Sequence, residues 1–211
     1  MSNIVSFFEN YGDKLLTATL QHLMYVLVSV SIAFVVALVL GIILSRFQKA
    51  AKVIVVFLST LQTIPGIVFM GVLFIYLGMQ PLTVVIALTT YAIFPILKNT
   101  FVGIQEVPYK YKEAAKGCGM SELQILIKVE LPLALPAILT GLKMATIYTV
   151  SWAVLAAMIG QGGLGDLIYM GIESNRQIII LGGAIPSALL ALFLGWLIDK
   201  LIKKCEVKGV R

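Results

Sequence analysis

Few residues in this sequence have side chains that could catalyse a reaction. His22 is the only histidine, and the two cysteines, Cys118 and Cys205, do not form a CxxC pair. A zinc site, or a nucleophile activated by a neighbouring base, needs several such groups close together. We therefore predict no metal site and no catalytic residue, and we interpret His22 as a polar residue near a helix end.

The glycines of one segment match a pattern that can bind dinucleotides. Gly160, Gly162 and Gly165 fit G-x-G-x-x-G, and Gly163 adds a fourth glycine. This pattern binds phosphate where it joins a strand to a helix, but here it follows a long apolar segment. No GxxxxGK[ST] motif that could hold ATP is present either. We expect a flexible turn whose glycines adopt conformations that other residues avoid.

The composition indicates the class of protein in which these few polar residues lie. Of the 211 residues, 60% are hydrophobic and only 12% are charged, about half the charged share of a soluble domain. A soluble fold of this length leaves about a quarter or more of its chain surface in water, so it could not cover this much apolar surface. The composition therefore excludes an ordinary cytosolic enzyme and predicts an all-α polytopic membrane protein.

Uncharged stretches define the expected membrane spans. The stretch 53–97 would be about 68 Å long as one helix, more than twice a hydrocarbon core of about 30 Å. The Gly/Pro break at 78–81 therefore divides it. We expect one domain, residues 1–211, with five spans at about 18–45, 53–77, 82–102, 133–159 and 177–201.

The distribution of basic residues predicts the orientation of these spans. Every Lys and Arg except Lys14 and Arg176 lies after the first span, around the connection of spans three and four, or after span five. Because cytoplasmic loops carry the excess of Lys and Arg, we expect the N-terminus outside and the C-terminus inside. The net charge of +6 then reflects topology rather than nucleic-acid binding. The start resembles no signal peptide, so the first span is expected to be retained.

The connection between spans three and four, about 103–132, is the only sizeable polar segment. Gly119 fits the left-handed position after a first short helix. Ser121 and Gln124 fit a capping box that begins a second short helix, and Pro132 is expected to end it. Two short helices joined by a sharp turn suggest a segment that docks on a partner.

The residues of this connection resemble the cytoplasmic motif of permease subunits of bacterial ABC importers. The match consists of Glu113-Ala114-Ala115, Gly119, Val129 and Leu131-Pro132. The family usually has Ile where this sequence has Val129, so the match departs slightly there. Segments 61–65, 91–100 and 159–165 resemble the osmoprotectant branch of this family, whose permeases import glycine betaine, choline, carnitine or proline betaine. The resemblance covers nearly the whole chain.

The resemblance implies a fold, a set of partners and a mechanism. It implies the type I importer permease fold, with five transmembrane helices and a cytoplasmic coupling-helix loop in the bacterial cell membrane. A homodimer or heterodimer of permeases would act with two cytoplasmic ATP-binding subunits and an external substrate-binding protein. ATP would be bound by the partner chains, so this chain needs no cofactor. The implied ATPase-coupling residues are Glu113, Ala114, Ala115, Gly119, Leu131 and Pro132.

The same resemblance suggests candidates for the translocation path and the outer gate. A quaternary ammonium has no N–H to donate, so its natural partner is an aromatic face. The candidate path residues are Gln62, Pro65, Tyr91, Tyr148 and Trp152, although each could equally serve helix packing. The candidate outer gate is the turn that contains Gly160, Gly162, Gly163 and Gly165.

Two alternatives remain open at this point. A permease of a methionine or other amino-acid ABC importer shares the same loop, number of spans and glycine turn. An ion- or proton-driven secondary carrier needs no ATPase, but it usually has a carboxylate or histidine deep in a span. Here the charged residues within the spans, such as Lys143 and Asp199, lie only near the inner ends.

Overall fold

The computed structural model describes residues 2–205, with side chains from residue 5 on, and every regular element within that part is helical. Lys208 and Arg211, which the orientation argument uses, lie outside the described residues. The elements in chain order are α1 (Ser2–Arg46), α2 (Gln48–Leu61), α3 (Gly66–Leu77), α4 (Pro81–Gln105), α5 (Tyr109–Gly117), α6 (Glu122–Ile125), the π turn η1 (Leu126–Glu130), α7 (Leu131–Ala153), the 3-10 segment η2 (Val154–Ile159), α8 (Leu164–Glu173) and α9 (Gln177–Cys205).

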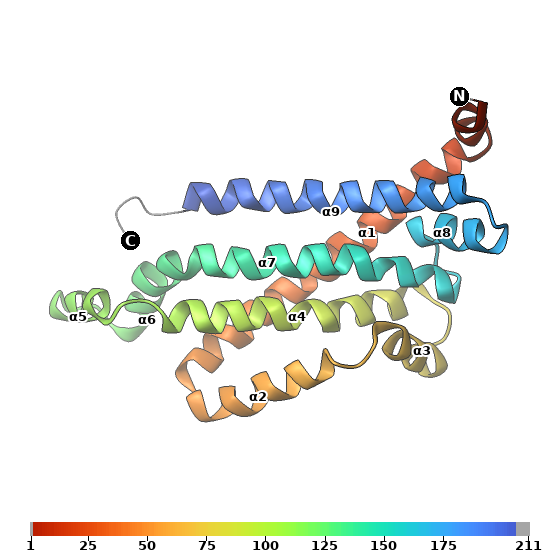
Figure 1. Ribbon diagram of the computed structural model, residues 1–211. Helices are drawn as coiled ribbons and strands as arrows, with labels where there is room; N and C mark the ends of the chain where they lie inside the picture. The colour runs from red at the N-terminus through yellow and green to blue at the C-terminus, as the bar shows by residue number, and fades with distance from the viewer. Residues whose placement is uncertain (1, 206–211) are drawn as a thin grey trace.

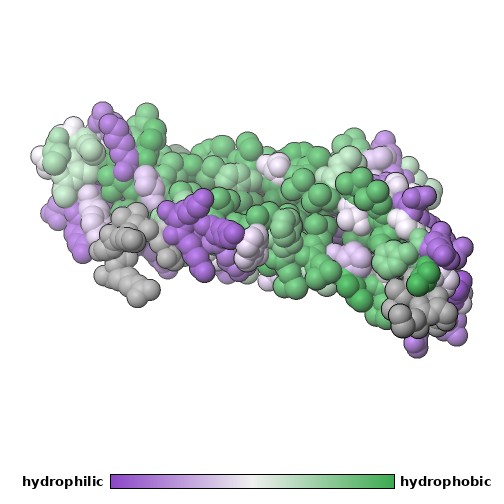
Figure 2. Space-filling model, turned by 90° about the horizontal axis from the view of Figure 1, so that it is seen from above, coloured by the Kyte–Doolittle hydropathy of each residue, from purple (hydrophilic) through white to green (hydrophobic). Residues whose placement is uncertain are grey.

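The long helices run roughly lengthwise and set the shape of the molecule. Figure 1 shows α4, α7 and α9 side by side, with α1 crossing them obliquely. The short helices α5 and α6 lie at one end, and α3 and α8 lie at the other. Hydrophobic residues cover the middle of the face in Figure 2, and hydrophilic residues gather toward its two ends. This banding matches the apolar core and polar edges of a bilayer.

Within residues 2–205, four helical segments are long and apolar enough to cross a membrane, or five if α2 and α3 together count as one. The segment expected as a continuous span over 53–77 is in fact broken, because α2 and α3 are bent by 91°. Pro65 stands at the N-cap of α3. Proline has no N–H to extend the helix and keeps the preceding residue out of helical geometry, so the break falls there.

Pro132 does not end a helix, contrary to the prediction. Helical structure runs without a break from Glu122 to Ile159, and Pro132 lies in the first turn of α7. The π turn before it explains this difference, since the Leu131 N–H bonds to the Leu126 carbonyl five residues back. The i+5 bond interrupts the α-helical hydrogen-bond pattern directly before Pro132, which has no N–H to donate, so the proline falls where that pattern is already broken.

Small residues allow α4 and α7 to pack closely. A side-chain carbon on Gly141 would lie 2.8 Å from the Pro95 carbonyl oxygen, and one on Gly103 would lie 2.8 Å from the Ala137 Cβ. Without hydrophobic attraction between helices in lipid, such close backbone approach is a main source of association. The α4–α7 pair thereby forms a rigid centre against which the site residues are placed.

Candidate functional site

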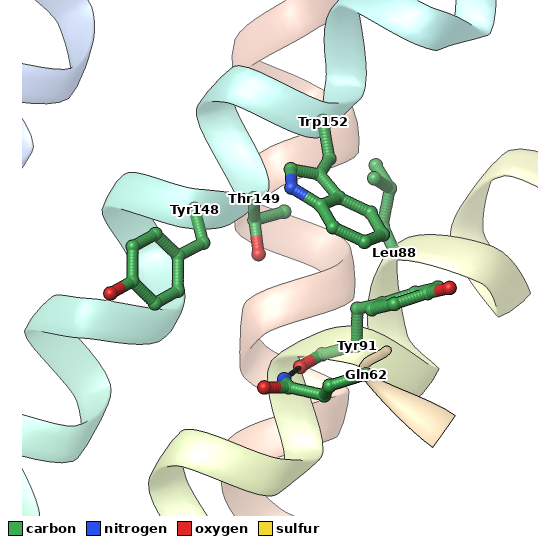
Figure 3. Close-up of a pocket in the computed structure, with 6 residues that line it drawn as sticks. All are labelled: Gln62, Leu88, Tyr91, Tyr148, Thr149 and Trp152. Atoms are coloured by element: carbon green, nitrogen blue, oxygen red, sulfur yellow. Dashed lines mark hydrogen bonds between the residues drawn. The ribbon is translucent and has the colours of Figure 1, made fainter. Parts of the chain in front are cut away.

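A cavity of about 220 Å³ lies where the α2–α3 break meets α4 and α7. Its lining residues are Gln62, Leu88, Tyr91, Tyr148, Thr149 and Trp152 (Figure 3). Four of the five residues predicted for the translocation path therefore lie around one cavity. The fifth, Pro65, is not among the lining residues and instead begins α3.

Aromatic rings dominate the lining of this cavity. The Tyr91 and Trp152 ring centroids are 3.8 Å apart at 50°, and Phe69 packs edge-on against Tyr91 at 5.2 Å. Since Tyr91 and Trp152 touch, a cation could not sit between them and would have to approach the ring faces from the cavity. Tyr148 is half exposed beside them. The six lining residues carry no charge, so the cavity suits an organic cation that binds through aromatic faces.

Hydrogen bonds attach the α2–α3 break to this cavity. The Gln62 side-chain N–H donates to the Tyr91 carbonyl at 3.0 Å, and the Tyr91 hydroxyl donates to the Ile64 carbonyl at 2.7 Å. At the start of α3, a side-chain carbon on Gly66 would lie 2.6 Å from the Trp152 ring. The break, α4 and α7 are therefore tied together by the residues that line the cavity.

The predicted details of the polar connection are confirmed in its turns and caps. Gly119 follows α5 with φ of +78°, and nothing lies within 4 Å of a side-chain carbon there. The backbone conformation rather than lack of space favours glycine at this position. Ser121 and Gln124 form the capping box, with bonds of 3.3 and 2.9 Å.

The motif residues on α5 divide between two faces of the helix. Glu113 and Ala114 are exposed, and Ala115 is buried. The neighbouring Lys116 pairs with Glu122 of α6 at 2.8 Å. This pair raises the pKa of Lys116 and lowers the pKa of Glu122. One face of α5 is thus free for a partner while the other packs on this chain.

The predicted outer turn is held by residues of α1 that sequence reasoning missed. The Gln21 side chain accepts from the Gly163 N–H at 3.1 Å and donates to the Gln161 carbonyl at 2.9 Å. The Tyr25 hydroxyl donates to the same carbonyl at 3.0 Å. Gln21 and Tyr25 are four residues apart on one helix face, which was the signal available in the sequence.

The prediction that His22 lies near a helix end is wrong. His22 lies within α1 and is fully buried. Its Nε2 is 3.0 Å from the Val150 carbonyl, and its Nδ1 is 3.4 Å from the Leu164 backbone nitrogen. A carbonyl can only accept and an N–H can only donate, so Nε2 carries the proton and Nδ1 is bare. His22 therefore links α1 to α7 and to the start of α8.

Glycine is required in the outer turn for two different reasons. Gly160, Gly162 and Gly163 have φ of +68°, +73° and +82°, in the region that other residues avoid. Gly165 does not, but a side-chain carbon there would overlap the Val154 carbonyl oxygen. In the following helix, burial raises the pKa of Asp166, and the charge of Lys14 partly offsets this effect.

Ion pairs at the other end of the molecule involve residues that the sequence analysis did not assign. Lys143 of α7 pairs with Asp199 of α9, with both carboxylate oxygens within 2.8 Å. Glu130, at the end of η1, is buried and pairs with Arg46 and Lys112. Among residues 2–205, no three His, Cys, Asp or Glu side chains lie close enough to share a metal ion.

Comparison with protein families gives one match over most of the chain. The model described as "Binding-protein-dependent transport system inner membrane component" matches residues 15–206. The chain is 39% identical to the carnitine transport permease protein OpuCB of Listeria monocytogenes over 211 residues, which is 100% of this chain and 97% of that protein. It is 36% identical, with the same coverage, to the choline transport system permease protein OpuBB of Bacillus subtilis.

Solved structures share the fold at lower sequence identity. An inward-facing structure of the MetNI methionine ABC transporter has a TM-score of 0.80 and 20% identity, covering 92% of this chain and 96% of that chain. A structure of an amino acid ABC transporter with histidines has a TM-score of 0.71 and 17% identity, covering 94% and 95%.

Proposed function

Because the chain belongs to the inner membrane components of binding-protein-dependent transport systems, we propose that it is the permease of an ABC importer for osmoprotectants with a quaternary ammonium group. The chain is a multi-pass membrane protein and a transport subunit, and its ATPase is a separate component. The family resemblance and the type I importer fold expected from the sequence are thereby confirmed.

The uncharged aromatic cavity is the observation that supports this substrate class. Relatives are named for carnitine, choline and glycine betaine, and these three solutes share a trimethylammonium group. Choline has no carboxylate, so the common requirement is a site for the cation alone. The rings of Tyr91, Tyr148 and Trp152 provide such a site in the cavity.

The proposed mechanism couples this cavity to ATP hydrolysis on partner chains. The exposed face of α5, with Glu113 and Ala114, contacts an ATP-binding subunit, while Ala115 packs against this chain. Gly119 sets the angle between α5 and α6, and Leu131-Pro132 begins α7. Nucleotide-driven movement of α5 then shifts the spans between inward-open and outward-open states. The glycine turn 160–165 serves as the outer gate.

The proposed assembly follows from the same family. A second permease copy, identical or related, pairs with this one above two ATP-binding subunits, and a substrate-binding protein delivers the solute from outside. ATP binds to the partner chains, and this chain holds no cofactor of its own. Residues 1–211 form one transmembrane domain with the N-terminus outside and the C-terminus inside, as the excess of Lys and Arg at the α5 end supports.

Uptake by the reconstituted transporter tests the substrate class. Liposomes containing the permease, its ATPase and its binding protein are supplied with labelled choline, carnitine, glycine betaine or methionine. We expect ATP-dependent uptake of the trimethylammonium solutes. Trp152→Leu should lower their uptake about 2- to 30-fold, the worth of one cation–π contact, while Trp152→Phe should retain more of it.

The outcomes separate the alternatives. Uptake of methionine but not of choline, carnitine or glycine betaine would indicate an amino-acid importer. Uptake that persists without the ATPase would indicate a secondary carrier. Equal uptake by wild type and Trp152→Leu, at equal amounts of assembled complex, would remove the aromatic cavity from the translocation path. A matched control is Leu189→Ala, an exposed residue of α9 outside the cavity.

A further inference from the structure

Within the part of the chain that the structure describes, Glu130 is the one Asp, Glu, Lys or Arg that is buried, with a relative exposure of 1%. It lies at the end of η1, in the helical stretch that continues into α7. A buried carboxylate is tolerated only when it is paired and hydrogen-bonded. The positions of its partners therefore decide what this residue does.

Two cations from different elements hold the Glu130 carboxylate. Arg46, in the last turn of α1, contacts both carboxylate oxygens, and its Nη1 lies 3.3 Å from Oε1. Lys112, in α5, places its Nζ 3.0 Å from the same Oε1. The fork of Arg46 fixes the carboxylate plane, and Lys112 adds a second contact from the opposite element. Glu130 thus joins three elements at one point.

The π turn explains why Glu130 points inward. The extra residue in a π turn rotates the residues that follow by about 100° relative to a continuous α-helix. Before the turn, Leu123 is mostly exposed, and within it Ile127 is exposed as well. Glu130, at the end of the turn, is buried instead. In a continuous α-helix, Glu130 would share the exposed face of Leu123 and Ile127, which lie seven and three residues before it, so the π turn is what brings the carboxylate into the interior.

Lys112 lies on the inner face of α5. It is three residues before Ala115, so the two share a face, while Glu113 and Ala114 lie on the exposed one. The main packing partners of α5 are η1 and α6. The ion pair with Glu130 is therefore a direct link from the motif-bearing helix to the long helices.

We infer that Glu130 is the positioning residue that transmits movement of α5 to α1 and α7. Through Lys112 it is held to α5, through Arg46 it is held to the inner end of α1, and through its own backbone it begins α7. Helix α7 carries Tyr148, Thr149 and Trp152 of the cavity. A shift of α5 therefore moves Glu130 through Lys112, and Glu130 moves α7 and, through Arg46, α1. This inference rests on the proposed docking of α5 to an ATP-binding subunit.

Single-arm variants test the inference in the reconstituted complex. Lys112→Met removes the α5 arm, and Arg46→Met removes the α1 arm. The measurement is solute imported per ATP hydrolysed, with the amount of assembled complex determined by co-purification of the ATPase. We expect each variant to assemble and to lower this ratio about 5- to 150-fold, the range typical of coupling between sites. Lys112→Arg should keep the ratio within about twofold of the wild-type value, because arginine retains the positive charge and a similar side-chain length.

Matched controls separate coupling from assembly and from the proposed function. Lys49→Met removes an exposed lysine at the start of α2, outside α5 and the Glu130 ion pairs, and should leave the ratio unchanged. If Lys112 acted only by binding the ATPase, the Arg46→Met variant would have a normal ratio of solute imported to ATP hydrolysed. That result would overturn the inference. A normal ratio in Lys112→Met, or failure of that variant to assemble, would also overturn it. Absence of ATP-driven uptake in the wild type would instead refute the proposed function.

Discussion

Individual side chains of α1 decide how the outer glycine turn is held. Gln21 makes two hydrogen bonds to the turn, and the buried His22 accepts a hydrogen bond from the Leu164 N–H at the start of α8. His22 also bonds to the Val150 carbonyl of α7. Leaving such buried groups unpaired costs about 1–3 kcal/mol each, so the contacts stabilise one arrangement of the turn. If the turn is the outer gate, opening it requires these bonds to break.

A pair of glycines with the same backbone conformation tests this attachment. Gly163 has φ of 82° and ψ of −177°, and Gly78 has φ of 80° and ψ of −178°. Alanine at either position should cost about 1–3 kcal/mol of backbone strain. Gly163→Ala should cost roughly 1 kcal/mol more, because its side-chain carbon would lie 3.3 Å from the His22 Nδ1.

Thermal unfolding of the two variants in detergent measures this difference. Nothing lies within 4 Å of a side-chain carbon on Gly78, so Gly78→Ala reports the backbone cost alone. Equal midpoints for the two variants would show that the contact with His22 does not constrain the turn.

At the scale of elements, rigid and adjustable contacts lie next to each other. Helices α4 and α7 meet at glycines, with little room for displacement. Helices α2 and α3 are bent by 91° and are held to the cavity by Gln62 and Tyr91. A break held by a few hydrogen bonds can change its angle at a small cost, whereas a close-packed crossing resists deformation. The cavity lies between these two kinds of contact.

The α4–α7 crossing can be tested with one substitution and a matched control. A side-chain carbon on Gly141 would lie 2.7 Å from the Asn99 Cβ and 2.8 Å from the Pro95 carbonyl oxygen. Gly141→Ala should therefore destabilise the protein by about 1–3 kcal/mol and lower the thermal midpoint in detergent.

Gly71 supplies the control for this prediction. It lies inside α3, and nothing is within 4 Å of its side-chain carbon. Gly71→Ala should be neutral or stabilising, by up to about 1 kcal/mol. A Gly141→Ala variant as stable as Gly71→Ala would mean that α4 and α7 are not in close contact.

At the scale of the whole molecule, charge is distributed by end rather than by face. The helices α5 and α6, with most of the basic connection, lie at one end, and α3, α8 and the start of α1 lie at the other. Trp196 and Lys200 stack at 3.7 Å on α9, as expected for aromatic and basic residues near a membrane interface. This arrangement supports the proposed orientation with the α5 end in the cytoplasm.

Cysteine labelling tests this orientation. Cys118 is exposed next to α5, so a variant with Cys205→Ser carries one accessible native thiol. A membrane-impermeant maleimide should label it in inside-out vesicles and not in intact spheroplasts, because the bilayer excludes the charged reagent.

Gly12→Cys, near the start of α1 with nothing within 4 Å of its side-chain carbon, provides the opposite control in a chain that lacks both native cysteines. It should be labelled in spheroplasts. Labelling of Cys118 from the spheroplast exterior would reverse the proposed topology.

Local patterns in the sequence were sufficient for the class of protein, the Gly/Pro break before α4, the capping box and the turn at Gly119. Each of these depends on residues that are neighbours in the chain. The apolar stretches predicted helical spans because a backbone in lipid must satisfy its own hydrogen bonds. The motif at 113–132 likewise needs only local spacing to be recognised.

Tertiary structure alone decided which distant residues meet. Arg46 and Glu130 are 84 residues apart in the chain, and His22 and Val150 are 128 apart. From the sequence, His22 was predicted to be an isolated polar residue. The burial of Glu130 could not be predicted, because the π turn that rotates this side chain inward is not visible in an apolar pattern. Burial and pairing depend on how helices pack, and packing is set by contacts between segments that the chain keeps far apart.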